Sequence, residues 1–120
     1  FVDIRYDVDI DCNVTQAGWR PFLLRKFLGE GSTYLRKNKK LAFFIEGTDC
    51  PKPYDVYWKV RNVGAEAIRR DMVRGNIVKE SGLHHIENTE FEGEHYVECF
   101  LVKNNVCVAR DRIEVPIGTL

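Results

Sequence analysis

The sequence predicts a mainly β protein, an antiparallel β-sandwich of about seven strands with one or two short helices. Apolar and polar residues alternate over several stretches of the 120-residue chain, and a period of two is the pattern of a half-buried strand. Glycine, proline and asparagine recur between these stretches, where they are typical of turns. We therefore expect residues 1–120 to form one domain.

The composition limits the classes of function. The chain has 18 Lys plus Arg and 18 Asp plus Glu, so its net charge is zero. This balance argues against a protein that follows a nucleic-acid backbone, but a pocket for a small anion needs only two or three cations. Residues 1–10 contain no apolar signal-peptide core, and no apolar run is long enough to span a membrane. The chain begins at Phe1 and its one methionine is Met72, so we expect a fragment of a longer protein.

The first third of the chain is expected to contain a strand and a short helix. Residues 1–12 are apolar at even positions, and the odd positions form an acidic row that includes Asp9 and Asp11. These carboxylates lie in steps of about 6–7 Å along a strand, so they are not expected to hold a metal ion. Residues 19–28 have helical spacing, with Pro21 suited to a first turn. We expect a helix that plugs the end of the sandwich, with a lid or bridging connection as the alternative.

The central element is a long strand over residues 53–64, which follows a buried strand over residues 41–47. Successive side chains of a strand point to opposite faces. One face then carries the core candidates Val56, Trp58 and Val60, and the other carries Tyr57, Lys59 and Arg61.

The second half of the chain is expected to begin with helical turns over residues 65–72 and a short strand over residues 73–79 that contains Arg74 and Gly75. Residues 81–88 have the composition of a polar link. The clearest hairpin joins residues 94–102 to residues 106–117 through an Asn104-Asn105 turn, since Asn tolerates a positive φ.

The four cysteines, Cys12, Cys50, Cys99 and Cys107, are expected to be free and buried, as in a reducing cytoplasm. In the predicted hairpin Lys103 faces Val106, Cys107 faces Val102 and Cys99 faces Arg110, so the two sulfurs of the hairpin are not cross-strand partners. A buried mid-chain Trp58 followed by a strand with Cys99 resembles the immunoglobulin layout without its disulfide.

The sequence does not predict a catalytic site, a metal site or a cofactor. It contains no glycine-rich phosphate loop and no nucleophile-elbow motif. His84, His85 and Glu87 could bind a metal, but neighbouring histidines of a strand point apart and no third ligand is specified. His95 and Cys99 would lie about 13 Å apart along one strand, beyond the reach of a nucleophile and its base.

Binding is the class of function that the residues favour. Tyr57, Lys59 and Arg61 project together, and Arg74 with Arg110 or Arg112 could converge on the same face. Arginine grips phosphate groups and tyrosine stacks on a base. Before any resemblance is considered, an ordinary solvated sheet face, whose cations pair with Glu98 or Asp111, is the favoured interpretation of these residues, and a ligand site is the alternative.

The sequence also resembles a known family. The stretches concerned are residues 52–67 (KPYDVYWKVRNVGAEA), 74–77 (RGNI), 93–99 (GEHYVEC) and 109–112 (ARDR), with 19–22 (WRPF) and 39–43 (KKLAF). Together they are similar to the AGS-C domain, the C-terminal sensor domain of bacterial adenylyl/guanylyl cyclases and SMODS nucleotidyltransferases.

The resemblance implies a non-catalytic, cytoplasmic domain that senses a nucleotide or a phage-derived ligand. It would regulate a linked nucleotidyltransferase or cyclase in antiphage defence, and it could form a homo-oligomer. The alternative is an immunoglobulin-like module for protein interaction or oligomerisation. The matching motifs and the cations of the hairpin nominate these ligand-binding residues: Tyr57, Trp58, Lys59, Arg61, Asn62, Arg74, His95, Tyr96 and Arg110.

Overall fold

The computed structural model describes residues 1–16, 18–31, 34–37, 39–62, 77–80, 84–88 and 93–118; for residues 62, 77, 78, 80, 84–88, 93 and 94 it describes the backbone alone. The expected helical turns over residues 65–72 and the expected site residue Arg74 lie outside these ranges. No described helix is both long enough and apolar enough to cross a membrane.

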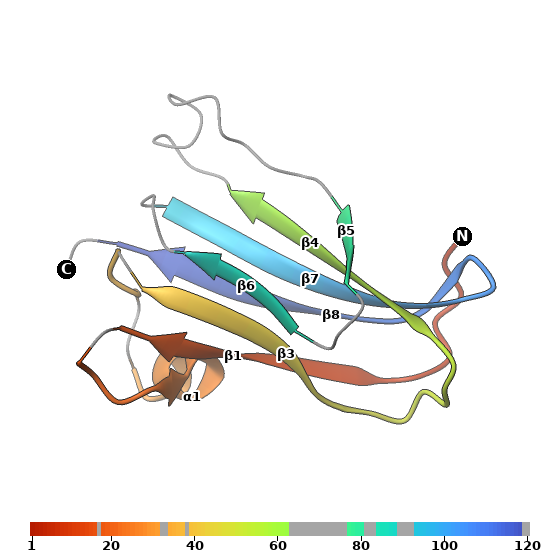
Figure 1. Ribbon diagram of the computed structural model, residues 1–120, viewed down its shortest axis with the longest axis horizontal. Coiled ribbons are helices and arrows are strands. Elements are labelled where there is room, and N and C mark those ends of the chain that lie inside the picture. Colours follow the sequence, from red (N-terminus) through yellow and green to blue (C-terminus); the bar gives the residue numbers. More distant parts are fainter. Residues whose placement is uncertain are drawn as a thin grey trace.

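Two antiparallel sheets of four strands form the described part of the fold (Figure 1). The first sheet has the order β2 (Phe22–Leu23), β1 (Val8–Thr15), β3 (Lys40–Thr48) and β6 (His84–Asn88). The second has the order β5 (Ile77–Glu80), β4 (Asp55–Asn62), β7 (Gly93–Lys103) and β8 (Val106–Ile117). The predicted antiparallel sandwich is thereby confirmed. Strands β1-β3-β6 and β4-β7-β8 are ordered like strands A-B-E and C-F-G of immunoglobulin domains.

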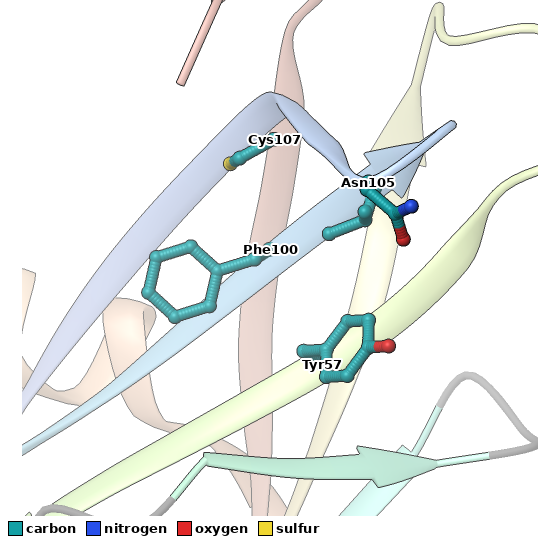
Figure 2. Close-up of a pocket in the computed structure, with 5 residues that line it drawn as sticks. Tyr57, Phe100, Asn105 and Cys107 are labelled. Carbon is teal, nitrogen blue, oxygen red and sulfur yellow. The ribbon is translucent and has the colours of Figure 1, made fainter. Parts of the chain in front are cut away.

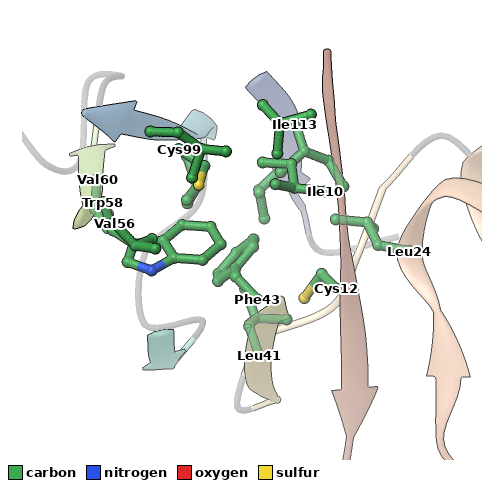
Figure 3. Close-up of a cluster of buried hydrophobic side chains, with 14 of the residues drawn as sticks. Ile10, Cys12, Leu24, Leu41, Phe43, Val56, Trp58, Val60, Cys99 and Ile113 are labelled. Atoms are coloured by element: carbon green, nitrogen blue, oxygen red, sulfur yellow. The ribbon is translucent and has the colours of Figure 1, made fainter. Parts of the chain in front are cut away.

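The core lies between the sheets and contains the predicted face of β4. Trp58 is fully buried, and Val56 and Val60 are each 5% exposed. Figure 3 shows the Trp58 ring pointing from the second sheet toward Phe43 of β3, and Ile10 and Cys12 of β1 lie on the opposite side of the cluster from Trp58. The alternation in β4 therefore predicted its buried face correctly.

The β7–β8 hairpin turns at Asn104 and Asn105, whose φ angles are 51° and 64°. Two positive φ values are those of a type I′ turn, as expected for this pair. Lys103 pairs with Val106 and Val102 pairs with Cys107, as predicted. Beyond Val102 the register shifts, so Cys99 pairs with Asp111 and not with the expected Arg110. The extra residue of this β-bulge turns Arg110 toward the outside of the sandwich.

The N-terminal stretch differs from its prediction, because β1 begins only at Val8. Residues 1–6 run beside β8 instead, where the Cys107 amide donates to the Phe1 carbonyl and the Asp3 amide donates to the Cys107 carbonyl. The expected acidic outer row is also interrupted. Asp11 is only 5% exposed, because helix α1 (Leu24–Gly29) lies over it: its carboxylate accepts from the Arg25 amide at 3.2 Å and from the Cys12 amide at 2.7 Å.

The predicted helix over residues 19–28 is shorter and later than expected. Helix α1 spans Leu24–Gly29, because Phe22 and Leu23 pair with β1 as strand β2. Trp19 is consequently 74% exposed. Residues 84–88, expected as a polar link, form β6 at the end of the first sheet.

One side chain of α1 connects the two sheets. The Arg25 guanidinium donates to the Ile10 carbonyl of β1 at 2.8 Å and to the Asp111 carboxylate of β8 at 3.2 Å. The same Asp111 carboxylate accepts from the Ile10 amide at 2.9 Å. The helix thus fixes the position of β1 beside β8, which the sequence pattern did not indicate.

All four cysteines are free and buried, as predicted. Burial is the main cause that raises the pKa of Cys12 and of Cys99 to about 12. These two thiols are neutral near pH 7, and a neutral thiol is a poor nucleophile.

Candidate functional site

The side of the second sheet that faces away from the core carries most of the predicted site residues. We call this side the outer face. Strand pairing arranges its side chains in three rows across β4, β7 and β8, and Lys79 of β5 extends the first of them. The rows are Tyr57, Phe100, Arg110; Lys59, Glu98, Arg112; and Arg61, Tyr96, Glu114.

Five of the nine predicted residues therefore lie together on the outer face, namely Tyr57, Lys59, Arg61, Tyr96 and Arg110. Trp58 and His95 do not join them. Trp58 is part of the core, and His95, 5% exposed, has the same strand parity as Val97 and Cys99 and so faces the interior. Asn62 pairs with His95 through the backbone, and its side chain lies outside the described part of the structure.

Two side chains of the third row, Tyr96 and Glu114, are in contact with Arg112 of the second row. The Arg112 guanidinium lies 3.7 Å from the centroid of the Tyr96 ring, and its Nε is 2.8 Å from a Glu114 carboxylate oxygen. Arg112 thus covers one side of the ring on which a ligand could have stacked. Both charges of the ion pair are about half exposed, so the pair itself contributes little stability.

Two other cations of the outer face have acidic neighbours. Lys59 lies directly across from Glu98 on β7. Lys79 Nζ is 3.5 Å from a carboxylate oxygen of Asp55 on β4. The expectation of an ordinary solvated face named Glu98 as an ion-pair partner; Glu98 stands across from Lys59, but the ion pair observed among these four residues joins Lys79 to Asp55. The other expected partner, Asp111, binds Arg25 and the Ile10 amide instead.

Arg110 differs from these cations. It is exposed, it lies across from Phe100, and it has no ion-pair partner among the residues that the structure describes. The bulge in β8 accounts for its outward position, since an unshifted register would have placed it opposite Cys99 on the core side. Arg110 is therefore available to an anionic ligand as far as the described residues are concerned.

A pocket of about 350 Å³ opens at the hairpin end of the outer face (Figure 2). It is lined by Tyr57, Phe100, Val102, Asn105 and Cys107. Only Tyr57 was predicted from the sequence. Phe100 and Cys107 could have been found from the sequence by pairing the strands, because Tyr57 faces Phe100 and the predicted turn already places Cys107 opposite Val102. A second pocket of about 340 Å³ lies nearby and includes Tyr54, Lys103 and Asn104.

Within the described part of the chain, no three His, Cys, Asp or Glu side chains are grouped so that they could hold a metal ion. The side chains of His84, His85 and Glu87 fall outside that part. The chemistry that the outer face offers is therefore aromatic contact, hydrogen bonding and positive charge.

Comparison with known families identifies the chain. A family model described as the adenylyl/guanylyl and SMODS C-terminal sensor domain matches residues 1–118. The chain belongs to this family. The resemblance noted in the sequence is thereby confirmed, and the family description supports a sensing, regulatory role for this sensor domain. No curated protein matches the chain.

Proposed function

We propose that this sensor domain is a non-catalytic regulatory unit that binds a nucleotide through the outer face of its second sheet. Its membership of a sensor family over residues 1–118 carries the sensing role. The ligand class follows from the outer face, where the Tyr57 ring lies in the same row as Arg110 and one row from Lys59. Rings that stack and cations that pair with phosphate are the two groups that a nucleotide requires.

The regulated partner is a nucleotidyltransferase or cyclase domain linked to this one, in bacterial antiphage defence. A ligand regulates such an enzyme only if its affinity differs between two states of the linked protein. A phage-derived ligand with a ring and an anionic group would satisfy the same residues. We assign this domain to the cytoplasm, in keeping with its four free thiols.

Titration calorimetry with a panel of cyclic and linear nucleotides tests the proposal. The double variant Lys59→Ala, Arg61→Ala should weaken binding by about 10-fold or more, because a hydrogen bond to a charged group is worth about 1.5–3 kcal/mol. The matched control Arg20→Ala, Lys26→Ala removes the same charge from exposed positions outside the second sheet and should change the affinity less than about 3-fold. Absence of heat with every nucleotide would refute the nucleotide ligand.

An interaction or oligomerisation module is the second candidate. Several large apolar side chains are exposed, among them Phe1, Val2 and Ile4 beside β8 and Trp19 near α1. This candidate requires a flat outer face, whereas a pocket lies at its hairpin end. A stable dimer in analytical ultracentrifugation, together with no binding of small molecules, would favour it.

A further inference from the structure

We propose that the pocket between Tyr57 and Phe100 is the subsite for the planar heteroaromatic ring of the ligand, and that the Asn105 side chain recognises the edge of that ring. This inference rests on the proposed function, because it assigns one end of the nucleotide to one part of the outer face.

The aromatic contact is the first reason. Tyr57 and Phe100 lie directly across from each other on β4 and β7, and each side chain is half-buried. Rings in this position have one side packed against the sheet and another side open to a ligand. Tyr96 is covered by Arg112, whereas no described residue stacks on Tyr57 or Phe100. The pair is therefore the better stacking surface of the outer face.

The size of the pocket is the second reason. Its volume of about 350 Å³ is at the lower end of the range of about 300–1,000 Å³ for small-molecule sites. A ring fits such a pocket, but the charged part of a nucleotide has to lie outside it. Arg110 is the direct cross-strand neighbour of Phe100, and Lys59 is the next outward residue of β4 after Tyr57, about 7 Å along the strand. If the ring of a nucleotide occupies the pocket, its phosphate groups would lie beside these two cations.

The polar groups of the pocket distinguish a heteroaromatic ring from a hydrocarbon. In the view of Figure 2 the Asn105 amide and the Tyr57 hydroxyl lie toward one side, and the Phe100 ring and the Cys107 sulfur lie toward the other. An asparagine amide offers both donors and an acceptor, so it can pair with the edge of a nucleobase. The type I′ turn holds the Asn105 backbone in a defined conformation.

The wall of the pocket that β8 forms is also fixed by backbone hydrogen bonds to the N-terminal residues. The backbone of Cys107 makes hydrogen bonds of 3.0 Å with Phe1 and 2.9 Å with Asp3. The neighbouring Val108 carbonyl accepts from the amides of Arg5 and Tyr6 at 2.9 and 3.1 Å. A wall fixed in this way loses little conformational freedom when a ligand binds, which favours affinity.

The experiment compares ATP, GTP, adenosine and inorganic triphosphate by calorimetry on the whole chain and four variants. Phe100→Ala removes the stacking ring, and Phe44→Ala removes a half-buried ring from the first sheet as its control. Asn105→Gly removes the amide and keeps a residue that accepts the positive φ. Asn104→Gly makes the same change at the neighbouring turn position, which lines the other pocket.

We expect Phe100→Ala to weaken nucleotide binding by about 10-fold or more, since stacking is a large part of base recognition. Asn105→Gly should change the ratio of the ATP and GTP affinities by at least about 3-fold, and neither control should do so. Adenosine should bind more weakly than ATP and remain sensitive to Phe100→Ala. Asn105→Gly tests the inference even if Phe100→Ala fails to fold, because glycine suits this turn.

Two results would overturn the inference and leave the proposed function standing. One is nucleotide binding that is equal in the pocket variants and their controls. The other is inorganic triphosphate binding as tightly as ATP, which would indicate a site for phosphate alone. If no nucleotide binds the unaltered chain, the proposed nucleotide-sensing function fails, and the subsite fails with it.

Discussion

The two tryptophans of the chain have opposite environments. Trp58 has no exposed surface and is the largest fully buried side chain among the described residues, whereas Trp19 is 74% exposed near helix α1. Both stand in stretches that the family resemblance includes. Trp58 therefore contributes to the packing of the sandwich, whereas the Trp19 side chain remains accessible at the surface.

Replacing Trp58 should be far more damaging than replacing Trp19. Trp58→Ala leaves a large cavity between the sheets and should lower the free energy of unfolding by about 3–5 kcal/mol. Trp19→Ala should change it by less than about 0.5 kcal/mol, because the side chain is largely solvated. Urea unfolding followed by circular dichroism measures both values. Equal losses in the two variants would contradict the assignment of Trp58 to the core.

At the scale of single site residues, the outer face also assigns unequal roles to its cations. Arg112 is engaged with Tyr96 and Glu114, and Lys79 with Asp55, whereas Arg110 has no such partner in the part of the chain that the structure describes. Because Arg112 already has an acidic partner and a ring, it would have to give up both to bind a ligand. Arg110 would not have to give up either.

At the scale of elements, the edge of strand β8 is covered by several segments, among them helix α1. Residues 1–6 cover one end of this edge, and Leu35 pairs with Ile117 at the other end. Between them, the Arg25 side chain donates to the Arg112 carbonyl at 3.1 Å. An edge covered in this way is protected from pairing with another strand.

The Asp111 carboxylate should be the most sensitive group of this edge. Asp111→Ala removes the acceptor for both Arg25 and the Ile10 amide, so it should cost about 1–3 kcal/mol of unfolding free energy. Asp111→Asn keeps an acceptor oxygen and should cost less. Chemical denaturation of the two variants gives the comparison. If the alanine variant is as stable as the parent, the hydrogen bonds of Asp111 with Arg25 and the Ile10 amide contribute nothing to stability.

At the scale of the whole molecule, the alternating pattern predicted the sandwich because it reports directly which side chains are buried. The faces of β4, the Asn104-Asn105 turn and the free thiols all follow from local sequence. The burial of Asp11 does not, because it is caused by helix α1, whose Arg25 amide donates to the Asp11 carboxylate. The inward direction of His95 does follow from the alternation of β7, which sets it apart from its neighbour Tyr96. The motifs that carry the family resemblance contain residues from both faces of a strand. They therefore nominated side chains that point to opposite faces and cannot bind one ligand together.

The cation beside the pocket shows the limit more clearly. The five lining residues come from β4, β7, the turn and β8 and meet through the pairings of Tyr57 with Phe100 and of Val102 with Cys107, whereas Arg110 lies across from Phe100 only because the bulge shifts the register between Leu101 and Val102. A single sequence gives no signal for a bulge at a position without glycine. The sequence predicted that these cations share one face of the sheet. It did not predict the acidic and aromatic side chains of β4, β7 and β8 that some of the cations contact.

The buried thiols make the stability of the whole domain sensitive to alkaline pH. Burial raises the pKa of Cys12 and of Cys99 from an ordinary 9.0 to about 12. Below pH 9 both thiols are neutral in the folded and the unfolded chain, and their contribution to stability is fully present. Between pH 9 and pH 12 the unfolded chain releases protons that the folded chain retains, so this contribution is lost as the pH rises. Each thiol should therefore lower the free energy of unfolding by about 1.4 kcal/mol between pH 8 and pH 10.

Urea unfolding at pH 8 and pH 10 in the presence of a reducing agent measures this loss. The double variant Cys12→Ala, Cys99→Ala should lose about 2–3 kcal/mol less than the parent over the same interval, although the smaller side chains lower its stability at both pH values. Val14→Ala provides the control, because it removes core volume from the same strand as Cys12 without removing a thiol. It should retain the full alkaline loss of the parent. Identical losses in the parent and the double variant would mean that the two thiols titrate alike in the folded and unfolded chains, which would require water to reach both sulfurs inside the sandwich.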